Sequence, residues 1–339
     1  MAAHPPSSCW ILTDGLVGKV NQCLGLAEAV GFADWAIQPK IIKPRFPWRF
    51  LPPRWWFRPL AADPGAGLTP PWPQLLICCG RSAVAPAAAI RRLARGGCIV
   101  VAVQEPKLPN SSFDLVITAF HDRLKGENLL QTSGALNRIS ARTLEQGRQE
   151  FAAQFAHLPR PLVGVILGGS NRRMKISDQA VHRLLAQLRG LVAAGCGLVV
   201  TTSRRTPPEV VAACQQLVAE VGTKGLILWA GDGSEAGKNP YFGILALADA
   251  LLITADSVSM ISEAATSGKP VYIAEISHSV GKFDQFVSHM INQGIARRFA
   301  GELDPPWSYE PLQDTATAAL QVRKLLAAIR SEDKDDPST

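Results

Sequence analysis

Short apolar runs alternate with amphipathic helical stretches along almost the whole chain. In the first half the apolar runs lie at 9–13, 74–79, 98–103 and 113–118, with helical spacing at 19–30 and 83–95. After a helical stretch that begins near residue 140, the same alternation returns at 162–167, 197–202, 226–229, 250–254 and 270–276, with helices at 178–194, 208–221 and 258–267. Strands that are apolar on both faces and alternate with helices are typical of covered parallel sheets. The pattern predicts an α/β fold.

The alternation breaks at HLPRP, residues 157–161, and then restarts. A chain of 339 residues is long enough for two domains, so we expect two Rossmann-type, doubly wound domains that face a central cleft, a GT-B-like arrangement. The expected boundaries are 1–158 for an N-terminal acceptor-side domain and 159–310 for a C-terminal nucleotide-sugar domain. A helix at 311–330 should pack back on the first domain, before a polar, disordered tail at 331–339.

Composition excludes several classes of protein. With 47% hydrophobic and 19% charged residues the chain is not disordered, and no apolar run reaches the roughly 20 residues of a membrane span. Residues 1–8 lack the basic and apolar pattern of a signal peptide. The seven cysteines show no CxxC spacing, which favours reduced, buried thiols. We therefore expect a cytoplasmic protein, and the composition rich in Ala, Gly, Pro and Arg is typical of a bacterium.

Basic residues are concentrated in the first half, where residues 1–160 carry 18 Lys and Arg against 10 Asp and Glu. Residues 161–339 carry 17 against 18. An insertion at 43–73 holds nine prolines, and its first part combines five basic with six aromatic residues. Residues 43–58 could meet an anionic membrane surface at the inner membrane face, or the insertion could be a stiff loop whose tryptophans pack on the domain. No nucleic-acid motif accompanies it, so nucleic acid is not an expected partner.

Ligands of open α/β sheets bind beyond the carboxyl ends of the strands. In the first domain the loop 13–22 follows a strand and matches neither the dinucleotide nor the Walker pattern. Together with the loop after the strand at 74–79, it supplies the residues expected on the acceptor side of the cleft, Gly15, Gly18, Lys19, Gln22, Arg81 and Ser82.

Two loops of the second domain carry residues suited to a phosphate. The segment 167–173 offers backbone N–H groups at paired glycines and polar side chains, and 201–209 offers hydroxyls and arginines at a strand end. The expected binding residues are Gly168, Gly169, Ser170, Asn171, Ser203, Arg204, Arg205 and Thr206. Adjacent arginines are also common as solvated surface residues.

The segment 254–270 is the most informative. Asp256 or Ser257 can cap the helix that follows the strand, and Ser259 lies in its first turn, where the helix dipole favours a diphosphate. Glu263 lies one turn beyond Ser259 on the same face, where its carboxylate can accept from both ribose hydroxyls. A capped helix with a solvated Glu is the alternative.

This segment, with its E-A-A-x-x-G-K-P pattern, resembles the donor-nucleotide motif of GT-B glycosyltransferases and UDP-GlcNAc 2-epimerases. More specifically, the chain resembles the mitochondrial fission ELM-like family, whose bacterial members have been labelled nucleoside-diphosphate-sugar epimerases. The resemblance rests on the stretches 10–22, 77–82, 113–139, 167–171, 201–209, 239–250 and 254–271. It adds Asn239, Tyr241 and Met260 to the binding residues.

The resemblance implies that a nucleotide sugar, with UDP expected, binds the second domain and that a sugar is transferred to an envelope or lipid-linked acceptor. No cofactor or metal is expected, since the only D-x-D lies at 333–335. The candidate bases are Asp14, preferred, then Glu105 and His121 with Asp122, while Arg204, Arg205 or Lys269 would neutralise the diphosphate. The alternatives are an epimerase and a non-catalytic membrane-associated scaffold, since the plant relatives are linked to recruiting a dynamin-type GTPase to the outer mitochondrial membrane.

Overall fold

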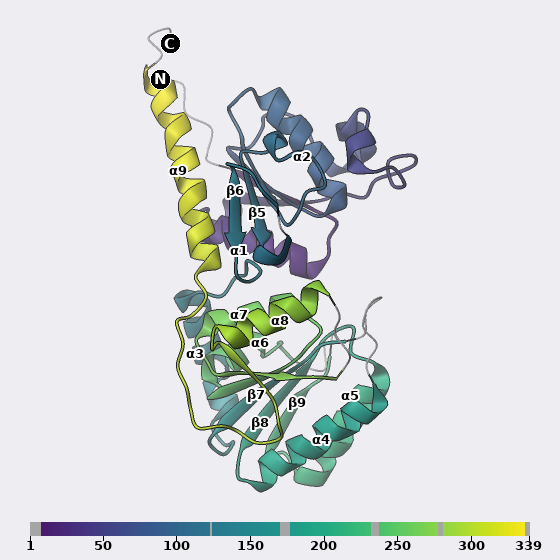
Figure 1. Ribbon diagram of the computed structural model, residues 1–339, viewed down its shortest axis with the longest axis vertical. Coiled ribbons are helices and arrows are strands. Elements are labelled where there is room, and N and C mark those ends of the chain that lie inside the picture. Colours follow the sequence, from purple (N-terminus) through teal and green to yellow (C-terminus); the bar gives the residue numbers. More distant parts are fainter. Residues whose placement is uncertain (1–7, 123, 170–176, 232–236, 277–280, 336–339) are drawn as a thin grey trace. The chain divides into compact units, whose positions relative to one another are not determined.

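The computed structural model divides the chain into two compact units, shown in Figure 1. The first comprises residues 1–138 together with 313–339, and the second comprises residues 139–312. The structure describes residues 8–122, 124–169, 177–231, 237–276 and 281–335.

A six-stranded, fully parallel sheet forms the centre of the first unit. The strand order is β2-β1-β3-β4-β5-β6. The strands are β1 (Cys9–Thr13), β2 (Ile37–Ile41), β3 (Leu75–Cys79), β4 (Ile99–Val103), β5 (Leu115–Ala119) and β6 (Leu129–Thr132). Every residue of β1, β3 and β4 is buried, as expected for strands covered on both faces. Their carboxyl ends line up because Thr13 of β1 pairs with Cys79 of β3, which pairs with Val103 of β4.

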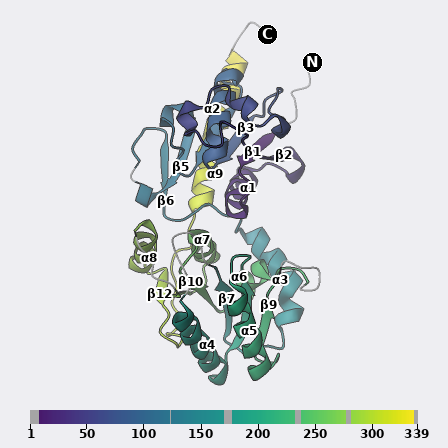
Figure 2. The same cartoon turned by 90° about the vertical axis from the view of Figure 1, so that its right-hand side faces the viewer.

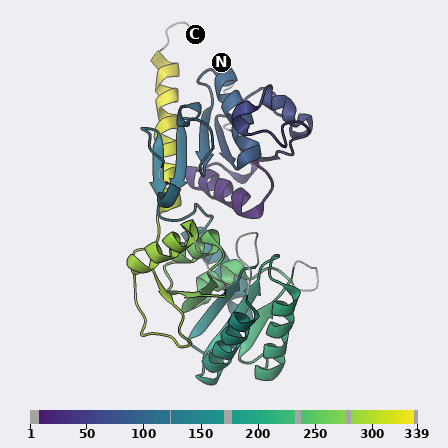
Figure 3. The ribbon, with the colours of Figure 1, turned by 45° about the vertical axis from the view of Figure 1, so that its right-hand side comes forward.

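Helices cover both faces of this sheet. Helices α1 (Val17–Val30) and α9 (Asp314–Asp335) share one core with the side chains of Ile11 and Ile77, whereas α2 (Arg81–Ala94) packs against the alternate residues, such as Leu12. Figures 2 and 3 show α9, in yellow, running along this unit. The chain thus returns to the first unit at its end, because α9 buries an apolar face against α1 and the sheet.

The insertion between β2 and β3 contains three short 3-10 helices, η2 (Pro53–Trp55), η3 (Pro59–Ala62) and η4 (Pro64–Ala66). Trp48 and Trp56 are buried against Ala85 of α2, and their indole N–H groups donate to the backbone oxygens of Phe57 (2.6 Å) and Leu51 (2.9 Å). Trp72, at the end of the insertion, packs edge-on against Trp10 of β1, so the packing interpretation is confirmed for three of its tryptophans. Other aromatic rings of the insertion remain on the surface, namely Phe46, Phe50, Trp55 and Phe57.

The second unit is built around another parallel six-stranded sheet, of order β12-β11-β10-β7-β8-β9. Its strands are β7 (Leu162–Leu167), β8 (Gly197–Thr202), β9 (Leu226–Trp229), β10 (Ala250–Thr254), β11 (Val271–Ala274) and β12 (Ala296–Arg298). Its helices are α3 (Ala141–Phe155), α4 (Asp178–Ala193), α5 (Pro208–Val221), α6 (Tyr241–Leu247), α7 (Val258–Ser267) and α8 (Lys282–Asn292). The central strands β7, β8 and β10 carry the loops expected to bind the ligand.

Helices α4 and α5 cover one face of this sheet, where Leu188 and Cys214 join the core of the strands. On the other face, α6 and α7 pack on β7, β10 and β11. Gly164 of β7 is required there, since a Cβ would lie 2.3 Å from the Ile244 side chain of α6. The α/β class with a GT-B-like pair of doubly wound units is confirmed.

The boundary between the units lies earlier than the expected division at 158. Helix α3 belongs to the second unit because it packs closely on α6, with the ring of Phe151 against Gly243. The expectation of a disordered tail from 331 also differs from the structure, in which α9 continues to Asp335. Residues 336–339 lie outside the described residues.

Two further expectations concern the chain as a whole. All seven cysteines are free and buried, as expected, and burial raises the pKa of the Cys214 thiol to about 11. Among the residues that the structure describes, no helix combines the length and apolar character of a membrane span.

Candidate functional site

Three loops meet at the carboxyl edge of the second sheet, where β7, β8 and β10 end. The amide of Gly168 donates to the hydroxyl of Thr254 (2.7 Å), and the amide of Gly169 donates to Asp256 Oδ2 (2.9 Å). From the third loop, the Thr206 hydroxyl donates to the carbonyl of Gly168 (2.6 Å). These bonds join the three loops to one another.

The paired glycines are required by this close approach. A Cβ on Gly168 would lie 2.0 Å from Asp256 Oδ1, and one on Gly169 would lie 2.0 Å from the carbonyl oxygen of Arg205. Neither distance is compatible with a larger residue. The sequence predicts free N–H groups at these glycines, and the structure differs because both groups are already used by Thr254 and Asp256.

The buried carboxylate of Asp256 accepts hydrogen bonds from the Gly169 amide and the Thr254 hydroxyl at this edge of the sheet. Its side chain is only 1% exposed, and burial raises its pKa, against hydrogen bonds from Thr254 and Gly169 that favour the charged form. The Arg205 guanidinium lies 3.6 Å from Asp256 Oδ2 and supplies a partial counter-charge. The role that the geometry gives Asp256 is therefore to hold the loops.

The loop after β8 forms a tight turn that is stabilised by the hydroxyls of Ser203 and Thr206. Ser203 Oγ lies 3.1 Å from Thr206 Oγ1 and accepts from the amide of Arg205 (3.2 Å). Arg204 and Arg205 are exposed at the tip of this turn, and the Arg204 side chain has no hydrogen-bond or ion-pair partner within the described residues. This guanidinium remains available to an anion.

The N-terminus of α7 begins at the same edge, directly after Asp256. Ser257 is its N-cap and accepts from the amide of Met260 (3.4 Å). Val258 and Ser259 follow, and in the described part of the chain neither of their amides, nor the Ser259 hydroxyl, has a hydrogen-bond partner. Unpaired amides at the positive end of a helix favour an anion.

Glu263 lies further along α7 and faces α6. The Tyr241 hydroxyl donates a short hydrogen bond to Glu263 Oε2, and burial raises the pKa of this carboxyl to about 7. Burial and the neighbouring Glu263 raise the pKa of Tyr241. Asn239 positions the start of α6, since its side-chain oxygen accepts from the Tyr241 amide (3.0 Å). The carboxylate is therefore paired and partly enclosed, rather than freely solvated.

The structure thus gathers most of the expected binding residues of the second unit at one sheet edge or on α7. Ser170 and Asn171 lie outside the described residues. Lys269 differs, because α7 runs antiparallel to the strands and ends at the opposite edge. There it lies near Asp249 and Arg160, which precede β10 and β7, so it is not available to neutralise a diphosphate at the carboxyl edge.

In the first unit the carboxyl edge is organised around an ion pair. Lys19, in the first turns of α1, makes a short contact with Asp14, which follows β1. Gly80 forms the turn after β3 with φ of +96°. A Cβ at this position would lie 2.7 Å from Lys19 Nζ, which is too close. Beside them Gln104 Nε2 donates to Gln22 Oε1 (3.2 Å). Asp14, Lys19 and Gln22 are therefore brought to one edge, as expected.

The two glycines of the first loop have different surroundings. Gly15 has φ of +83°, and its amide donates to the Thr13 hydroxyl (3.1 Å), so it serves the turn. Gly18 is exposed in the first turn of α1. Neither has a contact that identifies a ligand.

The other expected residues of this unit are placed less favourably. Arg81 donates to the carbonyls of Arg49 (3.0 Å) and Leu51 (2.7 Å), so it anchors the insertion. Glu105 pairs with the exposed Lys107 (2.6 Å). His121 and Asp122 lie in the 3-10 helix η6 (Phe120–Asp122) after β5.

Ser82 differs from its neighbours in having no partner. Its hydroxyl oxygen is buried and makes no hydrogen bond within the described residues. A buried hydroxyl without a partner is unusual and costs free energy.

Sequence reasoning missed two polar residues at these edges. Thr254 ends an apolar strand next to Asp256 and bonds to both Gly168 and Asp256, so a polar residue at the strand end was the available signal. Gln104 meets Gln22 across 82 positions, and no local pattern indicates such a pair. Among the described residues, no three His, Cys, Asp or Glu side chains gather where they could hold a metal ion.

Comparison with known proteins places this geometry in a family. The family model described as mitochondrial fission ELM1 matches residues 17–326. The mitochondrial fission protein ELM1 of Arabidopsis thaliana is 34% identical over 283 residues, which cover 76% of this chain and 64% of that protein. The chain therefore spans less than two thirds of this plant relative. An uncharacterized protein of Rickettsia prowazekii is 26% identical over 262 residues, covering 65% of this chain and 71% of that one.

Solved structures show a likeness in fold. A structure of the UDP-GlcNAc 2-epimerase of Methanocaldococcus jannaschii matches with a TM-score of 0.54 and 11% identity, covering 94% of this chain and 99% of that one. A structure of that enzyme in complex with UDP-GlcNAc and UDP matches with a TM-score of 0.50 and 10% identity, with the same coverage. At this identity the likeness concerns the fold.

Proposed function

The chain belongs to the mitochondrial fission ELM1 family, and we propose that it binds a nucleotide sugar at the carboxyl edge of the second unit's sheet. The observation that carries the proposal is the combination on one helix of unpaired amides at the N-terminus of α7 and a carboxylate, Glu263, further along it. The fold likeness to an epimerase whose structure contains UDP-GlcNAc and UDP agrees with this assignment.

The diphosphate and the ribose of the nucleotide each have matching groups in this proposal. The diphosphate accepts from the amides of Val258 and Ser259, with the Arg204 guanidinium as its counter-charge. The ribose hydroxyls donate to Glu263 and replace the bond from Tyr241. Because the pKa of Glu263 is about 7, binding should favour the ionised carboxylate and strengthen as the pH rises.

We further propose that the bound sugar is transferred, without a metal ion, to an acceptor hydroxyl in an envelope or lipid-linked molecule. In an inverting transfer, Asp14 takes the proton of that hydroxyl, the oxygen bonds to the anomeric carbon, and the bond from this carbon to the diphosphate breaks. Lys19 holds the Asp14 carboxylate in place, and Arg204 and Arg205 stabilise the charge on the departing diphosphate.

A non-catalytic scaffold is the second candidate. It is favoured by the exposed aromatic and basic side chains of residues 43–58, a surface suited to an anionic membrane. The plant relative is named for mitochondrial fission and not for an enzymatic activity. The scaffold shares the nucleotide site with the transferase proposal and differs from it in having no turnover.

Calorimetric titration with UDP, GDP, CMP and ADP tests the nucleotide site. We expect micromolar binding of one nucleotide, and loss of that binding in Glu263→Ala but not in Glu302→Ala, which removes an exposed carboxylate of the same unit. Binding by none of the four would contradict the proposal. With a nucleotide bound but no transfer to a broad acceptor panel, the scaffold would be favoured.

A second titration tests the role of Glu263 specifically. With uridine, which has no titrating phosphate, affinity should rise up to about tenfold between pH 6 and pH 8 as a carboxyl with a pKa of about 7 loses its proton. Glu263→Gln should bind uridine weakly and without this pH dependence. An unchanged pH dependence in that variant would show that another group is responsible.

A further inference from the structure

A pocket in the first unit lies away from the carboxyl edge of its sheet, between the insertion and the last turns of α2. We propose that it binds the phosphate and adjoining hydrocarbon of an anionic membrane phospholipid, and that it thereby fixes the insertion on a membrane surface. The proposal concerns a surface of its own and does not depend on nucleotide binding in the second unit.

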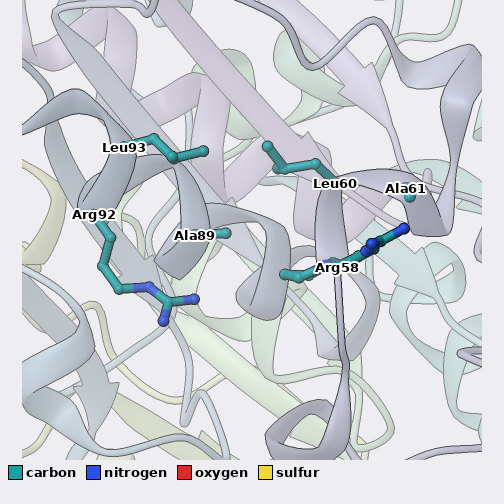
Figure 4. Close-up of a pocket in the computed structure, with 7 residues that line it drawn as sticks. Arg58, Leu60, Ala61, Ala89, Arg92 and Leu93 are labelled. Carbon is teal, nitrogen blue, oxygen red and sulfur yellow. The ribbon is translucent and has the colours of Figure 1, made fainter.

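The pocket combines an apolar lining with two arginines, as Figure 4 shows. Its volume is about 490 Å³, and Leu60 of η3 and Leu93 of α2 point toward each other across it. The remaining lining comes from Pro59, Ala61, Ala89, Arg58 and Arg92. Leu93 is 56% exposed, so its side chain is accessible to a ligand in the pocket.

The two arginines are available to an anion. Arg58 and Arg92 are exposed, and within the described residues neither makes a hydrogen bond or an ion pair. Arg91, their neighbour on α2, differs because it pairs with Asp114 (2.8 Å). Figure 4 shows the guanidinium groups of Arg58 and Arg92 on different sides of the pocket, so each can pair with an anion at its rim, next to leucines that match a hydrocarbon chain.

The charge of the surrounding sequence favours the same ligand. Residues 35–104 contain ten Lys and Arg and a single acid, Asp63. That carboxylate is already used, since it accepts from the amides of Lys43 (2.6 Å) and Gly65 (3.2 Å). This part of the chain therefore presents positive charge with little internal compensation, as expected for attraction to anionic lipid.

Exposed aromatic rings precede the pocket along the chain. Phe46, Phe50, Trp55 and Phe57 are 57–79% exposed, and the Arg54 guanidinium lies 5.3 Å from the centre of the Trp55 ring. Aromatic rings with arginines suit the headgroup region of a bilayer. Residues 46–58 thus offer membrane contacts next to a site for one lipid.

The lining argues against a nucleic acid as the occupant. Bases bind proteins mainly by stacking on aromatic rings, and none of the described residues that line this pocket is aromatic. Apart from the two arginines, the lining consists of leucine, alanine and proline side chains. Those groups match methylene chains instead.

The test uses a soluble lipid and matched variants of the full chain. Dihexanoyl phosphatidic acid below its micellar concentration should bind saturably, with one site per chain, and inorganic phosphate should bind far more weakly. The paired change Arg58→Gln with Arg92→Gln should weaken binding roughly 25-fold, about fivefold for each arginine. Leu93→Gln should weaken it too. The control variants are Arg95→Gln, at the end of α2 but outside the lining, and Leu320→Gln, an exposed leucine of α9.

The same variants are then tested for flotation with vesicles of phosphatidylcholine containing phosphatidylglycerol. The Arg58 and Arg92 variants should float less than Arg95→Gln, and all variants should keep the nucleotide affinity of the unaltered chain. An equal loss of flotation in Arg95→Gln would overturn the proposal of a lipid site in the pocket and would indicate diffuse charge attraction alone. Equal binding of inorganic phosphate, or binding of a short RNA in place of the lipid, would also overturn it.

Discussion

The loops at the carboxyl edges of the two sheets are held by different kinds of interaction. At the edge of the second sheet, the loops after β7, β8 and β10 are joined through backbone groups of Gly168 and Gly169 and a buried carboxylate, Asp256. At the edge of the first sheet, the corresponding loops carry an ion pair, Asp14 with Lys19, whose side chains keep 29% and 23% of their surface exposed.

The difference separates groups that stabilise the loops from groups that remain free to take part in binding or chemistry. Backbone bonds to a buried carboxylate are costly to break and leave those groups no freedom to meet a ligand, so the neighbouring α7 must provide the binding groups. A partly exposed ion pair contributes little stability, but its groups can change partners. We therefore expect substitutions at the second edge to act on folding, and those at the first edge to act on chemistry.

Substituting Gly169 should produce the largest effect. In Gly169→Ala the new methyl group would lie 2.0 Å from the carbonyl oxygen of Arg205, so the loops after β7 and β8 must separate. We expect a loss of about 3 kcal/mol in the free energy of unfolding, measured by urea denaturation. Gly190→Ala is the control, because no atom lies within 4 Å of its Cβ and alanine favours the interior of α4, with a gain of up to about 1 kcal/mol. Equal stability of the two variants would break the comparison.

Protonation of Glu263 should make the second unit sensitive to pH. The folded-state pKa of about 7 lies above the ordinary 4.5, so the folded chain holds this proton more tightly than the unfolded chain does. The stabilisation is complete below pH 4.5 and is lost as the pH rises through about 7, by at most about 3 kcal/mol. Asp256, whose pKa is also raised, adds in the same direction.

Hydrogen exchange of α7 peptides at pH 5 and pH 8 measures this effect within the second unit. Protection should fall at pH 8 in the unaltered chain and change less in Glu263→Gln. Glu302→Gln, on the surface of the same unit, should behave as the unaltered chain does. A pH response that persists in Glu263→Gln would assign it to a different group.

How far the sequence predicts these edges depends on the range of the interactions. Strands such as β1 and β10 are apolar up to a terminal threonine, and Ser257 and Gly268 mark both ends of α7, so local patterns identify them. The roles of Gly168 and Gly169 are different, because the partners of their amides lie 86 and 87 positions away. Spacing indicates a tight loop there, but it does not show that the amides are already used.

The same limit applies to the other elements. The sequence prediction missed helices α6 and α8 and the edge strands β2, β6 and β12. These edge strands are partly exposed and lack a continuous apolar run. Helix α3 was expected in the first domain because it precedes the HLPRP break, but its packing on α6 decides its place. Tertiary packing rather than local pattern sets this boundary.

Two hydroxyl groups allow a smaller test of the same comparison. Thr206 donates to the Gly168 carbonyl and accepts from the Ser203 amide (2.9 Å), whereas the buried Ser82 hydroxyl in the first unit has no partner among the described residues. Thr206→Val should cost about 2 kcal/mol in the free energy of unfolding, and Ser82→Ala should be neutral or stabilising by up to about 1 kcal/mol. Thermal and urea unfolding of the two variants gives the comparison directly. A substantial loss in Ser82→Ala would indicate a partner for this hydroxyl.

The ion pair of the first edge should have the smallest effect on stability. In a double-mutant cycle of Asp14→Asn and Lys19→Met we expect a coupling energy below about 1 kcal/mol, because both side chains are partly exposed and solvent screens them. Nucleotide affinity should not change, since the proposed nucleotide residues all lie in the second unit. Sugar transfer, once an acceptor is found, should nevertheless fall at least a hundredfold in Asp14→Asn, which keeps the shape of the side chain but cannot take a proton. A large loss of stability with unchanged transfer would give Asp14 the structural role that Asp256 has in the second unit.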